Sequence, residues 1–203
     1  FTVIGSELWS DEEGFDESVK AFGVTGICGS GIIEVVAEMF LSGVLSEDGV
    51  IDGALTSKNS RVFSQDRTWS YSLYEGDQRI AVTQTDIRQI QLAKAALYAG
   101  AKLLMDKAGI ESVDRIRLAG AFGSHIDPKY AMVLGLIPDC ELSRVESAGN
   151  AAGTGARIAL LNVAARTEIE AVVREITKIE TATETKFQEY FIGAMAFPHK
   201  VDA

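Results

Sequence analysis

The sequence predicts an α/β domain in which a mixed sheet is flanked by helices. Short runs of strand length alternate along the chain with longer segments of helical periodicity, and glycine-rich turns stand where strands meet helices. Hydrophobic residues make up 47% of the 203 residues, enough for a sizeable core. The expected organisation is one unit over residues 1–203, with a small antiparallel sheet inserted around residues 60–83.

Composition excludes several classes of function. The formal net charge is −10, whereas a general nucleic-acid or membrane-surface binder needs a basic face. Cys28 and Cys140 lack metal-ligand spacing, so we interpret both as free thiols in a reducing compartment, the cytoplasm. There is neither a leader nor a long apolar run. Because the chain starts at Phe1 inside an apparent strand, we expect a fragment of a longer protein.

In the first third of the chain, the residue pattern predicts a strand over residues 1–4, an acidic surface loop over 11–17 and a helix over 32–41. Ser30 is the expected N-cap of this helix and Gly43 its end. The preceding loop, Gly26-Ile27-Cys28-Gly29-Ser30-Gly31, places backbone N–H groups at a helix N-terminus, where phosphate can bind. Close packing of a loop beneath a helix is the alternative.

Residues 60–109 predict three strands followed by a long helix. Alternation indicates strands at 62–64, 69–74 and 79–83, with a turn at 75–77. Asp86 with Gln89 is the expected capping box, and Gly109 closes the helix. Its apolar face is expected to comprise Ile90, Ala93, Leu97, Ala101, Leu104 and Ala108. Gln91, Lys94 and Tyr98 form a second, polar stripe, either a solvated flank or a ligand contact.

The remaining segments again combine strands, glycine turns and helices. A strand over 113–118 runs into the glycine turn Gly120-Ala121-Phe122-Gly123, where a ligand can approach the main chain because glycine has no Cβ. Asp127 and Pro128 begin a short helix. Gly149-Asn150 precedes a helix to residue 165, and Thr167 opens another with a capping box. The last predictions are a strand over 176–182 and a helix over 187–196. For the first glycine turn the alternative is plain turn packing. For the small residues at Gly149-Asn150 the alternatives are close helix contact and a second loop that touches the ligand.

This order of motifs resembles the C-terminal half of the ATPase superfamily of actin, sugar kinases and heat-shock chaperones. Leu118-Ala119-Gly120-Ala121 is similar to the superfamily's adenosine motif, and Lys94 to a helix position that flanks the adenine. The resemblance implies one ribonuclease-H-like half of that fold. In the superfamily the nucleotide lies between two such lobes.

The chain more closely resembles the C-terminal domain of the ferredoxin-like reductive activators of corrinoid iron–sulfur proteins. The matching motifs are 26–31, 85–94, 119–123, Ile137-Pro138-Asp139, 149–153 and Phe187-Gln188. The resemblance implies an actin-like domain whose ATP binding and hydrolysis drive reduction of an inactive Co(II) corrinoid protein to Co(I). The implied nucleotide-binding residues are Gly29, Ser30, Gly31, Gln91, Lys94, Gly120, Ala121, Gly123, Gly149 and Asn150.

The sequence departs from the family pattern in two ways. It has no Asp-Gly-Thr phosphate loop to help hold Mg²⁺ and no iron–sulfur cysteine cluster, so we expect both in an upstream part of the protein. ATP or ADP with Mg²⁺ is the expected cofactor, and this chain alone should bind nucleotide weakly and hydrolyse none. Two alternatives stay open. One is the lobe of a small-molecule kinase using Asp86 or Asp127, and the other is a docking or homodimerisation module.

Overall fold

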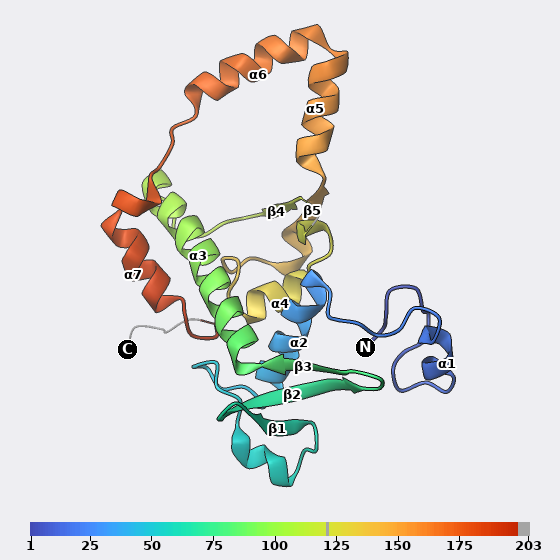
Figure 1. Cartoon of the computed structure of the whole chain (residues 1–203). Coiled ribbons are helices and arrows are strands. Elements are labelled where there is room, and N and C mark those ends of the chain that lie inside the picture. The colour runs from blue at the N-terminus through green and yellow to red at the C-terminus, as the bar shows by residue number, and fades with distance from the viewer. Residues whose placement is uncertain (121, 199–203) are drawn as a thin grey trace.

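The computed structural model describes residues 1–120 and 122–198. Two sheets and a set of helices build the described chain, and two helices reach outward from the body as an arch (Figure 1). In chain order, the helices and strands are α1 (Phe15–Val19), α2 (Gly29–Leu41), β1 (Val62–Gln65), β2 (Thr68–Glu75), β3 (Arg79–Thr83), α3 (Gln84–Ala108), β4 (Ile116–Ala119), α4 (Pro128–Val133), β5 (Val145–Gly149), α5 (Ala151–Leu161), α6 (Val163–Glu175) and α7 (Thr185–Gly193). The predicted mixed α/β class is confirmed.

The three strands predicted from alternation form an antiparallel sheet in the order β1-β2-β3. Val62 pairs with Tyr71, and Ser70 pairs with Thr83. The turn between β1 and β2 holds Asp66 and Arg67 at positive φ, the conformation of a two-residue hairpin turn that follows strand twist. Side chains from this sheet, including Val62 and Val82, enter the main core together with α2, α4 and Phe197.

Helix α2 starts earlier than predicted and has a different cap. Cys28, not Ser30, is the N-cap, and its Sγ accepts a hydrogen bond from the Gly31 N–H at 3.3 Å. Gly43 follows the helix at φ +72°, as expected of the glycine that ends it. The cap assignment was wrong because a cysteine sulfur can fill the place of a hydroxyl oxygen.

The long helix α3 has its predicted end at Gly109, but its start and its buried face differ from the prediction. Thr83 is the N-cap, and Asp86 is the third helical residue of a capping box with it, so Asp86 does not begin the helix and Gln89 is not part of the box. The apolar set does not form the buried face, since Leu97 and Leu104 are exposed. The buried residues are instead Ile87, Gln91, Lys94, Ala95, Ala99, Leu103 and Met105.

The second half of the chain is organised around a two-stranded parallel sheet, β4-β5. The short helix α4 begins as predicted, with Asp127 as N-cap and Pro128 as its first residue. The helix expected to reach residue 165 ends at Leu161. Asn162 breaks it with an extended backbone and caps α6, so Thr167 lies inside α6 instead of opening it.

Two terminal predictions were wrong. Residues 1–4 make only an isolated bridge between Thr2 and Trp9, and part of the expected acidic loop is the short helix α1. Residues 176–180 carry no strand, and a 3-10 turn (Thr181–Thr183) leads into α7, which starts and ends earlier than predicted. Within the described residues, none of the helices combines the length and apolar character that crossing a bilayer requires.

Candidate functional site

The two strands of the parallel sheet end side by side in glycines. Ala119 of β4 pairs with Gly149 of β5, and the Gly120 N–H donates a hydrogen bond to the Gly149 carbonyl at 2.8 Å. Because the strands are parallel, both turns lie at the carboxyl edge of the sheet, where α/β folds bind their ligands. The fold therefore joins two of the glycine segments singled out in the sequence into one continuous stretch of backbone.

Backbone conformation explains the two central glycines, and it leaves space beside them. Gly120 has φ +97° and Gly149 has φ +58°, which L side chains rarely adopt. A Cβ built at either position would meet no heavy atom within 4 Å. Gly123 differs, because a Cβ there would lie 3.0 Å from the Leu118 carbonyl carbon. Gly123 thus permits the turn to pack on β4, while Gly120 and Gly149 leave room for a ligand against the main chain.

The N-terminus of α2 meets the same turn. A Cβ at Gly29 would lie 3.1 Å from the ring of Phe122, so this glycine lets the aromatic ring pack against the start of the helix. Ser30 is half-buried, and the Cys28 thiol beside it is exposed. The structure thereby brings the loop with Gly29, Ser30 and Gly31 next to the glycine turn after β4, a contact that no sequence signal indicated.

Helix α5 begins directly after β5 and points its N-terminus toward the carboxyl edge of the sheet. The Asn150 side chain caps it by accepting a hydrogen bond from the Gly153 N–H at 2.9 Å. Small residues at the first helical positions, Ala151 and Ala152, leave the helix end accessible. A helix N-terminus carries partial positive charge and unpaired N–H groups, which suit an anionic group on a ligand.

Gln91 and Lys94 have other partners. Both are 1% exposed, and they fasten the C-terminal segment onto α3. Gln91 Nε2 donates to the carbonyls of Asp48 at 3.1 Å and Met195 at 2.8 Å. Its Oε1 has no hydrogen-bond partner among the described residues. A role beside a nucleotide stays a prediction for Gln91, because its amide nitrogen is already occupied in this structure.

Lys94 is held in the same way. Its Nζ donates to the carbonyls of Ala196 and Pro198 and lies 5.5 Å from the centre of the Phe197 ring. Burial lowers the pKa of this ammonium to about 7. Neither of the alternatives weighed from the sequence, a solvated flank or an open ligand contact, describes this surrounding, although the adenine contact itself stays a prediction. Ala121, another predicted site residue, lies outside the described residues.

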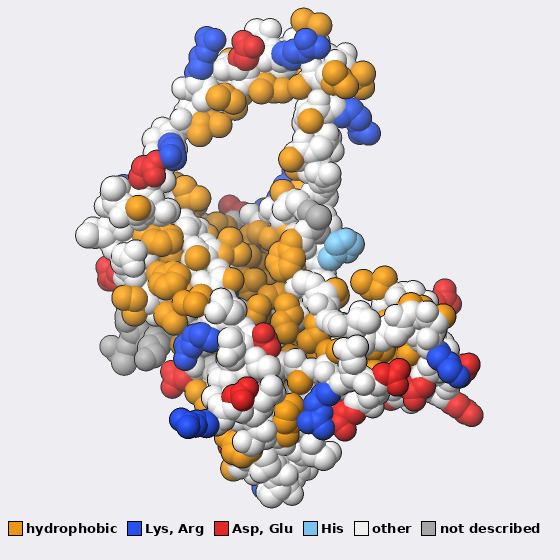
Figure 2. Space-filling model, viewed as in Figure 1, with side chains coloured by type: hydrophobic (Ala, Val, Ile, Leu, Met, Phe, Trp, Pro, Cys, Tyr) orange, Lys and Arg blue, Asp and Glu red, His pale blue; other side chains and the backbone are white. Residues whose placement is uncertain are grey.

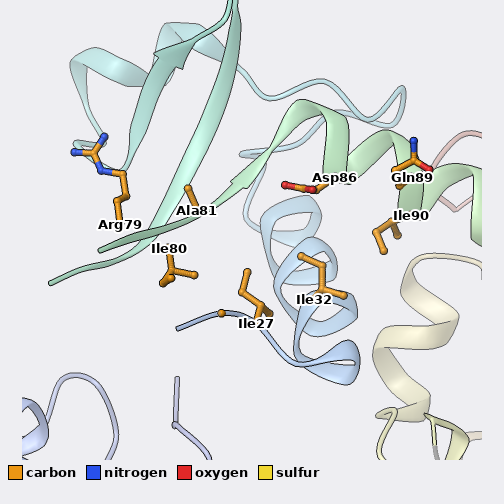
Figure 3. A pocket seen from close by; sticks show the side chains of 9 residues that line it. Ile27, Ile32, Arg79, Ile80, Ala81, Asp86, Gln89 and Ile90 are labelled. Carbon is orange, nitrogen blue, oxygen red and sulfur yellow. The ribbon is translucent and has the colours of Figure 1, made fainter. Parts of the chain in front are cut away.

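Two cavities adjoin the loop before α2. One of about 460 Å³ has an isoleucine floor of Ile27, Ile32, Ile80 and Ile90 (Figure 3). Its charged neighbours are engaged, since Asp86 belongs to the capping box of α3 and Arg79 pairs with Glu75 at 3.1 Å. The other, of about 580 Å³, is lined by aromatic side chains and by Cys28, Ser30 and Gly31. Both cavities lie along the start of α2, and neither is lined by Gly120, Gly123 or Gly149.

Acidic side chains contribute little to this site. Asp86 and Asp127, the two aspartates on which a kinase reading depended, both serve as helix-capping groups; Asp127 Oδ1 accepts from the Lys129 N–H at 2.7 Å. Among residues 1–120 and 122–198, no group of three His, Cys, Asp or Glu side chains is placed to hold a metal ion. The site is therefore a backbone surface built from glycines and helix N-termini.

A parallel sheet that ends in paired glycine turns, with helix N-termini around them, is the arrangement expected of an actin-like domain, an ASKHA domain. The fold is similar to that of a solved structure, the reductive activator for corrinoid, iron-sulfur protein, with a TM-score of 0.77 and 31% identity; the match covers 85% of this chain and 28% of that chain. The chain belongs to the family described as the C-terminal domain of RACo, the ASKHA domain, which matches residues 1–203.

A curated relative is the corrinoid activation enzyme RamQ of Eubacterium limosum. It is 36% identical over 188 residues, which are 87% of this chain and 32% of RamQ. The chain therefore spans about a third of the length of the curated relative it matches. The resemblance inferred from the six sequence motifs is confirmed by family, relative and fold together.

Proposed function

We propose that this chain is the nucleotide-binding part of an ATP-dependent activator of a corrinoid protein. The observation that carries the proposal is the junction of Gly120 and Gly149 at the carboxyl edge of the parallel sheet, in a chain whose relatives are corrinoid activators. The cytoplasm is the compartment that suits two free thiols, Cys28 and Cys140.

The residues present fit a nucleotide. The open space beside Gly120 and Gly149 would take the adenosine, since among the described residues no heavy atom beyond the adjoining ones comes within 4 Å of a Cβ built at either glycine. The N-terminal N–H groups of α5 after Asn150, and of α2 at Gly29, Ser30 and Gly31, would face the phosphates. Gly123 belongs to the same turn, and Ala121, which follows Gly120 in the sequence, is proposed for the same ligand. Mg²⁺ ligands and the first phosphate loop would come from the rest of the polypeptide, so the isolated chain should hydrolyse no ATP.

The nucleotide would supply phosphoanhydride free energy for an otherwise uphill reduction of the partner's cobalt from Co(II) to Co(I). In this proposal an iron–sulfur cluster in the upstream part of the protein provides the electron. The present chain would position the nucleotide. It would hold the adenosine part of the nucleotide against the ends of β4 and β5, so that contacts made to the phosphates by the rest of the polypeptide act on a fixed ligand.

The test uses the full-length polypeptide, its reductant and a corrinoid protein in the Co(II) state, followed by cobalt absorbance. We expect Co(I) to accumulate with Mg-ATP and not with Mg-ADP or a non-hydrolysable analogue. In parallel, ADP should protect the amides of residues 120–124 from hydrogen exchange, with amides at the β2–β3 turn as the internal control. Equal reduction with and without ATP would sink the proposal, and so would unchanged exchange at residues 120–124 with saturating ADP.

A further inference from the structure

The aromatic side chain of Phe122 lies between two segments of the candidate site. It belongs to the 3-10 turn Phe122–Ser124 that follows Gly120. A Cβ built on Gly29 would lie 3.1 Å from one carbon of its ring and 3.4 Å from another, so the ring packs directly on the start of α2. Phe122 is 51% exposed and is not part of the main core. Its ring therefore joins the turn to α2 without contributing much to the packing of the interior.

Each of the two segments keeps its shape through hydrogen bonds of its own. In the glycine turn, the Ser124 N–H and Oγ both donate to the Gly120 carbonyl, at 3.1 Å and 2.9 Å. At the start of α2, the Ile32 N–H donates to the Cys28 carbonyl at 3.0 Å, which closes the first turn of the helix. The Phe122 ring makes none of these hydrogen bonds. It therefore affects the distance between the segments and not the shape of either.

The junction between the glycine turn and the start of α2 depends on packing. Figure 2 shows mainly apolar and uncharged side chains over the part of the body where β5 and the start of α2 lie, with the charged ones gathered elsewhere on this face. Among the described residues, no ion pair joins residues 120–125 to residues 26–34. Farther along α2, Tyr130 of α4 donates to Glu38 at 2.5 Å. The helix as a whole is thus placed by α4, and Phe122 acts on its first turn.

A nucleotide that contacts both segments needs them at a fixed spacing. In the proposed function the adenosine lies beside Gly120 and the phosphates face the N–H groups at the start of α2. Because the two parts of the ligand are covalently linked, the second contact adds affinity only where the spacing of the two segments matches the ligand. Packed side chains transmit a displacement instead of absorbing it, so a ring between the segments keeps that spacing.

We infer that Phe122 is a positioning residue, which sets the distance between the glycine turn and the phosphate-facing start of α2 by packing on Gly29. The lack of a side chain at Gly29 is part of the same arrangement, since any larger residue there would push the ring away. The inference rests on the proposed function, because it takes the two contacts of the nucleotide as given. It adds the residue that makes them one site.

The experiment measures the binding of adenosine and of ADP to the full-length polypeptide by isothermal titration. Phe122→Ala should leave the affinity for adenosine within about twofold and weaken ADP about tenfold, a usual size for coupling between two sites. The ratio of the two affinities therefore falls about tenfold. Phe191→Ala is the matched control, because Phe191 is a half-buried aromatic residue in α7 that stacks on Phe187. It should leave the ratio unchanged.

A second variant tests whether the ring acts through Gly29. Gly29 has no positive φ, so alanine fits its backbone, and the added methyl group meets only the Phe122 ring within 4 Å. Gly29→Ala alone should lower the ratio about threefold by displacing the ring, and it should change nothing further when combined with Phe122→Ala. If Gly29→Ala lowers the ratio by the same factor in both backgrounds, the methyl group blocks the phosphates directly and the inference is wrong.

The remaining outcomes separate this inference from the proposed function. If the unaltered protein binds neither adenosine nor ADP, the proposed function fails and the inference falls with it. If it binds both, and the ratio in Phe122→Ala equals that of the unaltered protein, only the inference fails. A loss of both affinities by the same factor would also overturn it, because Phe122 would then support the turn itself and not its distance from α2.

Discussion

Replacing Gly120 by alanine separates a ligand role of the glycine turn from a purely structural one. Gly120 has φ +97°, so an alanine there is strained by about 1–3 kcal/mol. Steric overlap adds nothing, because a Cβ at this position meets no heavy atom within 4 Å. The same space is where the proposed adenosine would lie against the backbone. A methyl group in it should weaken nucleotide binding about tenfold or more, equivalent to about 1.4 kcal/mol.

Gly109→Ala is the matched control. Gly109 has φ +67°, a Cβ there also meets nothing within 4 Å, and it precedes β4 instead of following it. Its substitution should cost about 1–2 kcal/mol of stability and leave affinity unchanged. Both variants are compared with the unaltered full-length protein by isothermal titration with ADP and by urea unfolding. If Gly120→Ala is folded and binds ADP as tightly as Gly109→Ala does, the glycine turn is a packing feature and the reasoning fails.

Three further predictions concern residues that hold the body of the domain together. Burial lowers the folded-state pKa of Lys94 to about 7, so between pH 7 and its ordinary pKa the unfolded state binds more protons and stability should rise with pH, by at most about 1.4 kcal/mol per unit. Lys94→Met should abolish this rise in urea unfolding between pH 7 and 10, whereas Lys102→Met, at a more exposed position, should retain it. Cys28→Ser should keep or raise stability and Cys28→Ala should lower it by about 1 kcal/mol, because serine is the better N-cap; an equal loss in both would contradict the cap. The hydrogen bond from Tyr190 holds the pKa of Asp106 below its ordinary value, and the stabilisation it gives is lost as pH falls through that folded pKa. Asp106→Asn should therefore speed amide hydrogen exchange in α7 at neutral pH. If the exchange rates in α7 stay unchanged, the hydrogen bond between Tyr190 and Asp106 does not help to hold α7 against α3.

Local patterns predicted the elements whose cause is local. The hairpins around Gly76 and the end of α3 at Gly109 follow from turn and cap chemistry within a few residues. The N-caps of α2 and α3 were misplaced by two and three residues because Cys28 and Thr83 each compete with a nearby polar residue, Ser30 or Asp86, for the N-cap position. Residues 176–180 include the β-branched Ile176, Thr177 and Ile179, yet carry no strand, since no partner strand pairs with them among the described residues.

The candidate site was predictable in its parts but not in its assembly. The turn at Gly120 was recognised as a strand end and Gly149-Asn150 as the start of a helix, but strand β5 before Gly149 was not predicted. The hydrogen bond between the two turns depends on the parallel pairing of β4 and β5, which the sequence does not specify. The contact of Gly29 with Phe122 spans more than 90 residues and has no local signal. The resemblance to a known family predicted that the glycine segments belong to one site, which the local sequence patterns alone could not predict.

On two faces of α3, local sequence did not predict which side chains are buried. Gln91 and Lys94 were expected either on a solvated flank or at a ligand, but their acceptors are carbonyls about 100 residues away in the C-terminal segment. Leu97 and Leu104 were expected on the buried face because of their spacing, but both side chains are more than half exposed. In the first case a distant part of the chain provides the partner. In the second case the apolar periodicity of α3 predicts a burial that the described residues provide only in part.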